Sequence, residues 1–238
     1  GWAPLCKYEL LLDEIRERLL ARRFGPDVVS KLKPILQAGW DIIRQGTMVA
    51  GLPLLHGSRL LPKDWRLDGV NANWGVLMRF QKPGTPLVTC GDDEVNCSNH
   101  AAWQLQAESV RIDDVRRDQA EALRLTDACI DAIHCLSGKL SPTDHAYLMR
   151  VYTTTKRVLQ ALQAAVEGAY ATQIMRDNYD DVAEPEALFR HAMEDMARTA
   201  DELAVACASP QVYREYQHLA PALREIAEQL EATAHPST

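Results

Sequence analysis

Apolar residues recur at spacings of three and four in several parts of the chain, which is the pattern of an amphipathic α-helix. The first such stretch predicts a helix from about Pro4 to Phe24, ended by Gly25-Pro26, and the next predicts one from about Asp27 to Gln45. Pro34 should kink the second helix or mark its first turn. The apolar positions are Leu5, Tyr8, Leu11, Leu12, Ile15, Leu19 and Leu20, then Val28, Val29, Leu32, Ile35, Leu36, Ile42 and Ile43.

Two later segments, 99–136 and 143–167, contain neither glycine nor proline and predict two long central helices. Gly138 suits a helix C-terminal cap and Ser141-Pro142 suits a helix start, so the connection is short and the two helices should pack antiparallel. Their apolar seams are Ile112, Val115, Ala122, Cys129, Ile133 and Leu136, then Leu148, Val151, Thr155, Val158, Leu162, Ala165 and Ala169.

Two further helices are predicted at the end of the chain, from Pro185 to Cys207 and from Pro210 to Ala234. Because a proline inside a helix removes a hydrogen bond, Pro221 should kink or break the last helix near Leu219. The predicted fold is therefore all-α, an antiparallel helical bundle with two long central helices in a single domain spanning residues 1–238.

A loop-rich insert over residues 46–98 interrupts the helical pattern. Seven of the 12 glycines and four of the 12 prolines lie between Gly46 and Gly91. Within it, segments 74–80 and 86–90 flank a Pro-Gly turn and predict a small β-hairpin. Since an isolated hairpin is marginally stable in water, we expect the insert to lie against the helices and cap the bundle.

Charge argues against a nucleic-acid partner. The chain carries 26 basic and 33 acidic residues, a formal net charge of -7. The densest basic group, Arg16 to Arg23, is preceded by and interleaved with acidic side chains, as on a solvated helix face. The sequence contains no apolar run long enough to span a bilayer, and 47% of its residues are apolar. We therefore expect a globular protein.

The six cysteines predict one disulfide, and four of them stay open, since Cys129 or Cys135 could pair with Cys6 or Cys207 or remain a free thiol. Cys90 and Cys97 flank a short acidic loop whose ends can meet, whereas Cys129 and Cys135 point to different faces of one helix and cannot pair. The chain begins with Gly1 rather than Met, so we expect a processed or trimmed chain. These observations favour a periplasmic or otherwise extracytoplasmic location, with the cytoplasm as the alternative.

Catalytic and metal-binding motifs are weak. Asp131 with His134, and His191 with Glu194, share helix faces but lack the further carboxylates of a di-iron bundle. Segment 64–69 begins like a calcium loop, but Arg66 replaces one ligand and the final glutamate is missing. No glycine pattern matches a phosphate-binding loop. The sequence predicts neither a metal nor a cofactor.

The apolar segment 48–62, broken by Gly and Pro and followed by two tryptophans, allows two interpretations. It can fold back over the bundle and bury Leu52, Leu54, Leu55, Leu60 and Leu61. It can also present an exposed patch to a partner or a membrane surface, in which case the binding residues would be Trp65, Trp74, Leu54 and Leu55.

Three functional hypotheses follow. The first is a non-enzymatic helical interaction domain, the extracytoplasmic part of a membrane-associated or sensor-like protein or a neutralising partner, which binds a protein and is compatible with homo-oligomerisation. The second is a sensor holding a small molecule between helices near Tyr152, Thr155 and Tyr170. The third is an enzyme with a site at the junction of bundle and cap, using His56, His100 or Asp68.

Overall fold

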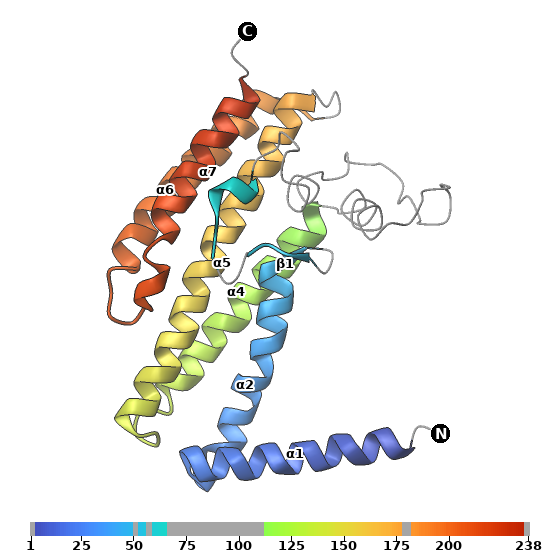
Figure 1. Cartoon of the computed structure of the whole chain (residues 1–238), viewed down its shortest axis with the longest axis vertical. Coiled ribbons are helices and arrows are strands. Elements are labelled where there is room, and N and C mark those ends of the chain that lie inside the picture. Colours follow the sequence, from blue (N-terminus) through green and yellow to red (C-terminus); the bar gives the residue numbers. More distant parts are fainter. Residues whose placement is uncertain (1–2, 50–51, 56–58, 66–111, 178–181, 236–238) are drawn as a thin grey trace.

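The computed structural model describes residues 3–49, 52–55, 59–65, 112–177 and 182–235, where six α-helices pack together (Figure 1). The all-α prediction is confirmed in this part of the chain. The α-helices are α1 (Ala3–Phe24), α2 (Pro26–Thr47), α4 (Ile112–His134), α5 (Pro142–Asp177), α6 (Pro185–Ala206) and α7 (Leu219–Ala234). The short elements are β1 (Met48–Val49), β2 (Leu52–Pro53) and the 3-10 helices η1 (Pro62–Trp65) and η2 (Arg214–Tyr216).

The start of α5 follows the predicted capping pattern. The Ser141 hydroxyl oxygen accepts a hydrogen bond from the Asp144 backbone N–H at 3.1 Å, and the hydroxyl donates to the Asp144 carboxylate at 2.7 Å. Pro142 occupies the first helical position, where its missing N–H is not needed. These contacts satisfy backbone groups that a helix start would otherwise leave unpaired.

The end of the preceding helix differs from the prediction. Helix α4 ends at His134 and the chain continues through turns to Ser141, so Gly138 is not its cap. Among the described glycines, only Gly25, between α1 and α2, has the positive φ of a left-handed residue, at 94°. Backbone hydrogen bonds from Lys139 and Leu140 to the Leu136 carbonyl close the turn instead.

The two prolines predicted to disturb helices, Pro34 and Pro221, lie at different places in their helices. Pro34 lies inside α2, not in its first turn. The helix predicted over 210–234 is broken as expected: η2 precedes α7, and Pro221 falls in the first turn of α7, where a proline is tolerated.

Helices α4 and α5 lie along each other, and their contacts show the register. His134 lies beside His145, with ring centroids 6.1 Å apart, next to the turn that joins the helices. Farther from the turn, Lys156 donates to Asp127 at 2.6 Å, and Arg116 binds Glu167. Residues later in α5 therefore contact residues earlier in α4.

The core has two clusters, and the 36-residue helix α5 contributes to both. One cluster joins the first half of α5 to α2 and α4, and includes Leu32, Ile133 and Leu159. The other joins the second half of α5 to α6, α7 and the first turn of α4, and includes Leu162 and Leu230. Helix α5 therefore connects the two halves of the described structure.

Only part of the insert is described. Strands β1 and β2 pair antiparallel, with Met48 opposite Pro53 and Val49 opposite Leu52. Helix η1 packs against α7. The predicted hairpin of 74–80 and 86–90 lies outside the described residues, as do residues 99–111 of the helical segment predicted over 99–136.

Candidate functional site

The structure buries the described part of the predicted partner-binding patch. Leu54 and Trp65 belong to the core cluster around α6 and α7, and the Trp65 side chain is fully buried. Leu55 is partly buried against the same cluster, and Trp74 lies outside the described residues. The exposed-patch interpretation is therefore corrected at Leu54 and Trp65. These two side chains instead follow the alternative of a segment folded over the helices, because burial removes their apolar area from water.

The polar residues proposed to hold a small molecule serve the packing of the helices. The Tyr152 hydroxyl donates to the Ile35 backbone carbonyl at 2.6 Å, and burial raises the pKa of this phenol, with a smaller contribution from Cys129. Thr155 donates to the carbonyl one turn earlier, at Val151. Tyr170 is buried, with its ring 5.3 Å from the guanidinium carbon of Arg116.

The structure does not describe the residues that the enzyme hypothesis names as catalytic. His56, Asp68 and His100 lie outside the described residues. Where side chains are described, no group of three or more His, Cys, Asp or Glu residues could hold a metal ion. His191 lies 3.4 Å from Asp195, not paired with the Glu194 suggested by the sequence.

Three cysteines have described side chains: Cys129 lies in α4, Cys135 directly follows that helix, and Cys207 directly follows α6. Cys129 is buried and Cys135 is exposed, so the two point to different faces, and Cys207 is buried in the other core cluster. All three are free thiols. Burial raises the pKa of Cys129 and of Cys207, which favours the unreactive protonated form. The predicted pair Cys90 and Cys97 lies outside the described residues.

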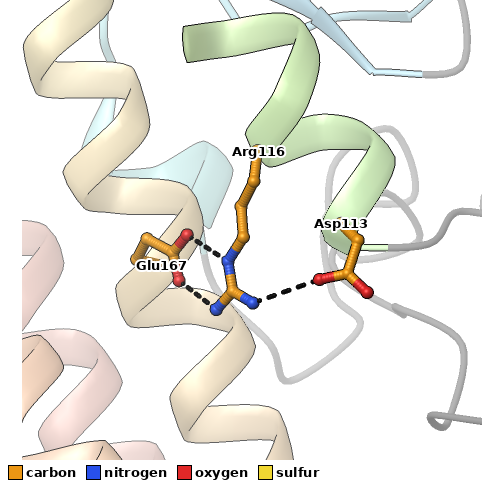
Figure 2. A network of polar contacts seen from close by, with 3 residues as sticks. All are labelled: Asp113, Arg116 and Glu167. Carbon is orange, nitrogen blue, oxygen red and sulfur yellow. Dashed lines mark hydrogen bonds and ion pairs between the residues drawn. The ribbon is translucent and has the colours of Figure 1, made fainter.

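A polar groove of about 480 Å³ lies beside α5 and α6, next to the ion pair in Figure 2. Arg116 of α4 donates from Nε and one terminal nitrogen to both carboxylate oxygens of Glu167, each at 2.7 Å, and its other terminal nitrogen lies 3.5 Å from Asp113. The hydrogen bonds to Glu167 raise the pKa of Arg116. Across the groove, Arg198 binds Asp195 at 2.7 Å. These carboxylates already neutralise the arginines, so the groove is a poor site for an anion.

A second groove, of about 690 Å³, lies near the end of α7 and has a different composition. Its floor includes Phe189 and Met193, both mostly buried. The His235 ring packs edge-on to Phe189, with centroids 5.7 Å apart. The charged lining consists of Glu186, Arg190, Glu194 and Glu231. An apolar floor with an acidic margin suits an amphipathic cation better than an anion.

The exposed apolar side chains are concentrated on the first two helices. Of the seven large hydrophobic residues exposed in the described part of the chain, five lie on α1 and α2, and the other two are Tyr147 and Val205. Trp40 is 65% exposed. The α1–α2 surface, as we define it, consists of Ile15, Leu19, Leu36, Trp40 and Ile43.

Sequence reasoning placed four of these residues on apolar helix faces but did not identify them as a surface. Periodicity shows which side of a helix is apolar, but not how much of that side a neighbouring helix covers. The apolar positions predicted for the second helix do not include Trp40, which lies beside them on the helix. The signal that could have found it is the continuation of the α2 apolar face past Leu36 to Trp40 and Ile43, at spacings of four and three.

No family model, curated protein or solved structure matches this chain. In the part of the chain that the structure covers, none of the helices combines the length and apolar character needed to cross a membrane.

Proposed function

We propose that this chain is a non-enzymatic helical interaction protein whose α1–α2 surface binds a protein partner. In this proposal α2 and α4 to α7 form an antiparallel bundle, capped at one end by the insert over residues 46–98. Burial of Leu54, Leu60 and Trp65 supports the capping role. The observation that carries the proposal is that, among the side chains the structure describes, five of the seven exposed large hydrophobic ones lie on two helices.

Trp40 is the expected centre of the surface because buried tryptophans contribute a large share of the binding energy in protein interfaces. The test is capture of a partner from the cells that make the protein, using the wild-type chain and the Trp40→Asp variant as bait. We expect Trp40→Asp to lose the captured protein and Val205→Asp, on α6, to retain it, with circular dichroism confirming that both are folded. Equal capture by both variants would refute this surface.

We further propose an extracytoplasmic location with a Cys90–Cys97 disulfide, supported by the short acidic loop between these residues. Alkylation of the native protein without reductant, followed by mass spectrometry of its peptides, tests the bond. We expect Cys90 and Cys97 to escape alkylation until a reductant is added, while Cys135, which is exposed, reacts at once. Alkylation of all three before reduction would contradict the disulfide.

A second candidate function is binding of an organic cation in the groove that contains Phe189 and Met193. The three glutamates outnumber the basic side chains Arg190 and His235 at its margin, and this favours a cation with an apolar body. Thermal unfolding with phenylethylammonium, and with phenylacetate as a matched anion, tests this function. Only the cation should raise the melting temperature, and Glu194→Gln should reduce that rise. Equal effects of the two ions would refute it.

A further inference from the structure

The groove that contains Phe189 and Met193 is also lined by metal-binding side chains that no sequence motif marks. They come from three places in the chain: Met175 lies near the end of α5, Met193 lies on α6, and His235 directly follows α7. Figure 1 shows that the end of α5, the start of α6 and the end of α7 lie at the same end of these helices. The fold therefore brings two thioether sulfurs and one imidazole to a single groove of about 690 Å³.

The burial of the three side chains leaves each of them available to the groove. Met193 is 7% exposed and lies on the floor, and Met175 is partly buried against the same core cluster. His235 is exposed, and its ring packs edge-on to Phe189 of the floor. Because a methionine side chain is unbranched and has three rotatable bonds, each sulfur can turn toward a shared ion without a movement of its helix.

This set of donors favours a soft metal ion. Thioether sulfur selects Cu(I), and imidazole is also a good ligand for copper. Calcium and magnesium require oxygen ligands, and zinc sites use thiolates, imidazoles and carboxylates. Across the side chains that the structure describes, no three His, Cys, Asp or Glu residues could hold such an ion. A metal ion in this groove must therefore use the two methionines.

The charges around the groove favour a cation as well. Thioethers and a neutral imidazole carry no charge, so they cannot balance the charge of a bound ion. The lining also contains three carboxylates, Glu186, Glu194 and Glu231, against the single guanidinium of Arg190. The excess of negative charge raises the local concentration of cations at the groove.

We infer that this groove binds one Cu(I) ion through the sulfurs of Met175 and Met193 and a ring nitrogen of His235. The inference does not depend on the α1–α2 surface. It also differs from the binding of an organic cation in the same groove, because it requires sulfur and not only an apolar floor. Leucine has nearly the same volume as methionine, so Met→Leu substitutions remove the sulfur ligands and keep the floor.

Nuclear magnetic resonance of the methionine methyl groups, labelled with carbon-13, tests the site. The probe is Ag⁺, which shares the charge and softness of Cu(I) and is not oxidised in air. The protein carries Cys135→Ser, because the exposed thiol would also bind silver. The signals of Met175 and Met193, identified by their loss in the Leu variants, should shift together and saturate. The signal of Met149, which is buried in the other core cluster, should not move.

The affinity for Cu(I) itself is measured without oxygen, in ascorbate, by competition with a coloured chelator. Met175→Leu, Met193→Leu and His235→Gln should each raise the dissociation constant about tenfold or more, since each removes a ligand. Met149→Leu should leave it unchanged.

Methyl signals of Met175 and Met193 that stay unshifted in excess Ag⁺, or that shift equally with Zn²⁺, would overturn the inference. So would an unchanged dissociation constant for Cu(I) in the folded Leu variants. Phenylethylammonium separates the two uses of the groove. If Met175→Leu weakens the binding of Cu(I) but keeps the response to phenylethylammonium, the sulfur site is supported. If the wild-type chain responds to phenylethylammonium and not to Ag⁺ or Cu(I), the metal site is excluded and the organic-cation function stands.

Discussion

Tyr152 shows how one buried polar group links three helices. It lies on α5, and its hydroxyl donates to the Ile35 carbonyl of α2, which the Cys129 thiol of α4 also approaches at 3.9 Å. Burial raises the pKa of Tyr152 above the ordinary value of about 10 for a tyrosine. The folded chain therefore retains the phenolic proton at a pH where the unfolded chain loses it.

This shift predicts a loss of stability at alkaline pH. The free energy of unfolding contributed by the neutral phenol is fully present below about pH 10 and decreases as the pH rises above that value. Tyr152→Phe should lower the free energy of unfolding by about 1 kcal/mol near neutral pH, through loss of the hydrogen bond. Above about pH 10 the difference between variant and wild type should shrink.

Urea unfolding at neutral and alkaline pH measures both effects, and the exposed Tyr147→Phe serves as the matched control. A deficit of the same size at both pH values would show that the Tyr152 phenol does not titrate in the unfolding transition.

At the scale of a single helix, two glycines of α2 have opposite surroundings. A Cβ atom at Gly46 would overlap the Leu159 side chain and come within 2.9 Å of the Ala122 Cβ, so α2 approaches α4 and α5 closely there. A Cβ at Gly39 would meet only the Tyr152 hydroxyl, at 3.7 Å, which is an ordinary contact.

Alanine substitutions should therefore have opposite signs. Gly46→Ala should destabilise the protein by about 1 to 3 kcal/mol because it overpacks a buried contact. Gly39→Ala should be neutral or stabilise it by up to about 1 kcal/mol because alanine favours helix formation. Chemical denaturation of the two variants measures the difference. A stabilising Gly46→Ala would mean that α2 does not pack this closely on Leu159.

We expect the ion pair that joins α4 to α5 to contribute less to the free energy of unfolding. Arg116 and Glu167 form a bidentate pair, but both side chains are about one third exposed, so solvent and salt weaken their attraction. Arg116→Met, which keeps an unbranched side chain next to Tyr170, should cost about 1 kcal/mol or less. The deficit should diminish as salt is added to the unfolding experiment. A larger, salt-independent loss would indicate that the arginine acts through packing instead.

The elements that the sequence predicts well are those with strong local signals. Gly25-Pro26 separates α1 from α2, Ser141-Pro142 starts α5, and Pro221 forces the break before α7. The prediction that Gly138 caps the end of α4 was wrong because a glycine after a helix is compatible with several kinds of turn. Helix α5 continues through Gly168 to Asp177, and a Cβ atom at Gly168 would overlap the Met196 side chain of α6.

The candidate surface depends on long-range packing, which periodicity does not encode. Leu36 and Ile42 look alike in the sequence, yet Ile42 packs inside the chain and Leu36 is exposed. Trp65 and Trp40 were distinguishable only once the tertiary contacts were known. The sequence suggested Trp65 as a binding residue, whereas Trp65 is fully buried and Trp40 is largely exposed.

At the scale of the whole molecule, α5 belongs to both core clusters, and this predicts a single cooperative unfolding transition for the described helices. Leu32 of α2 and Leu230 of α7 are each fully buried, but in different clusters. Leu32→Ala and Leu230→Ala should each cost about 2 to 5 kcal/mol, since each leaves a cavity in a packed core.

Because α5 packs in both clusters, each substitution should destabilise the distant helix as well as its own. Hydrogen exchange of the backbone amides, read by mass spectrometry, distinguishes the two possibilities. Leu230→Ala should accelerate exchange in α2 as much as in α7. Leu32→Ala should likewise accelerate exchange in α7 as much as in α2. If Leu230→Ala accelerated exchange only in α6 and α7, the two clusters would unfold independently and α5 would be a connection between two separately stable parts.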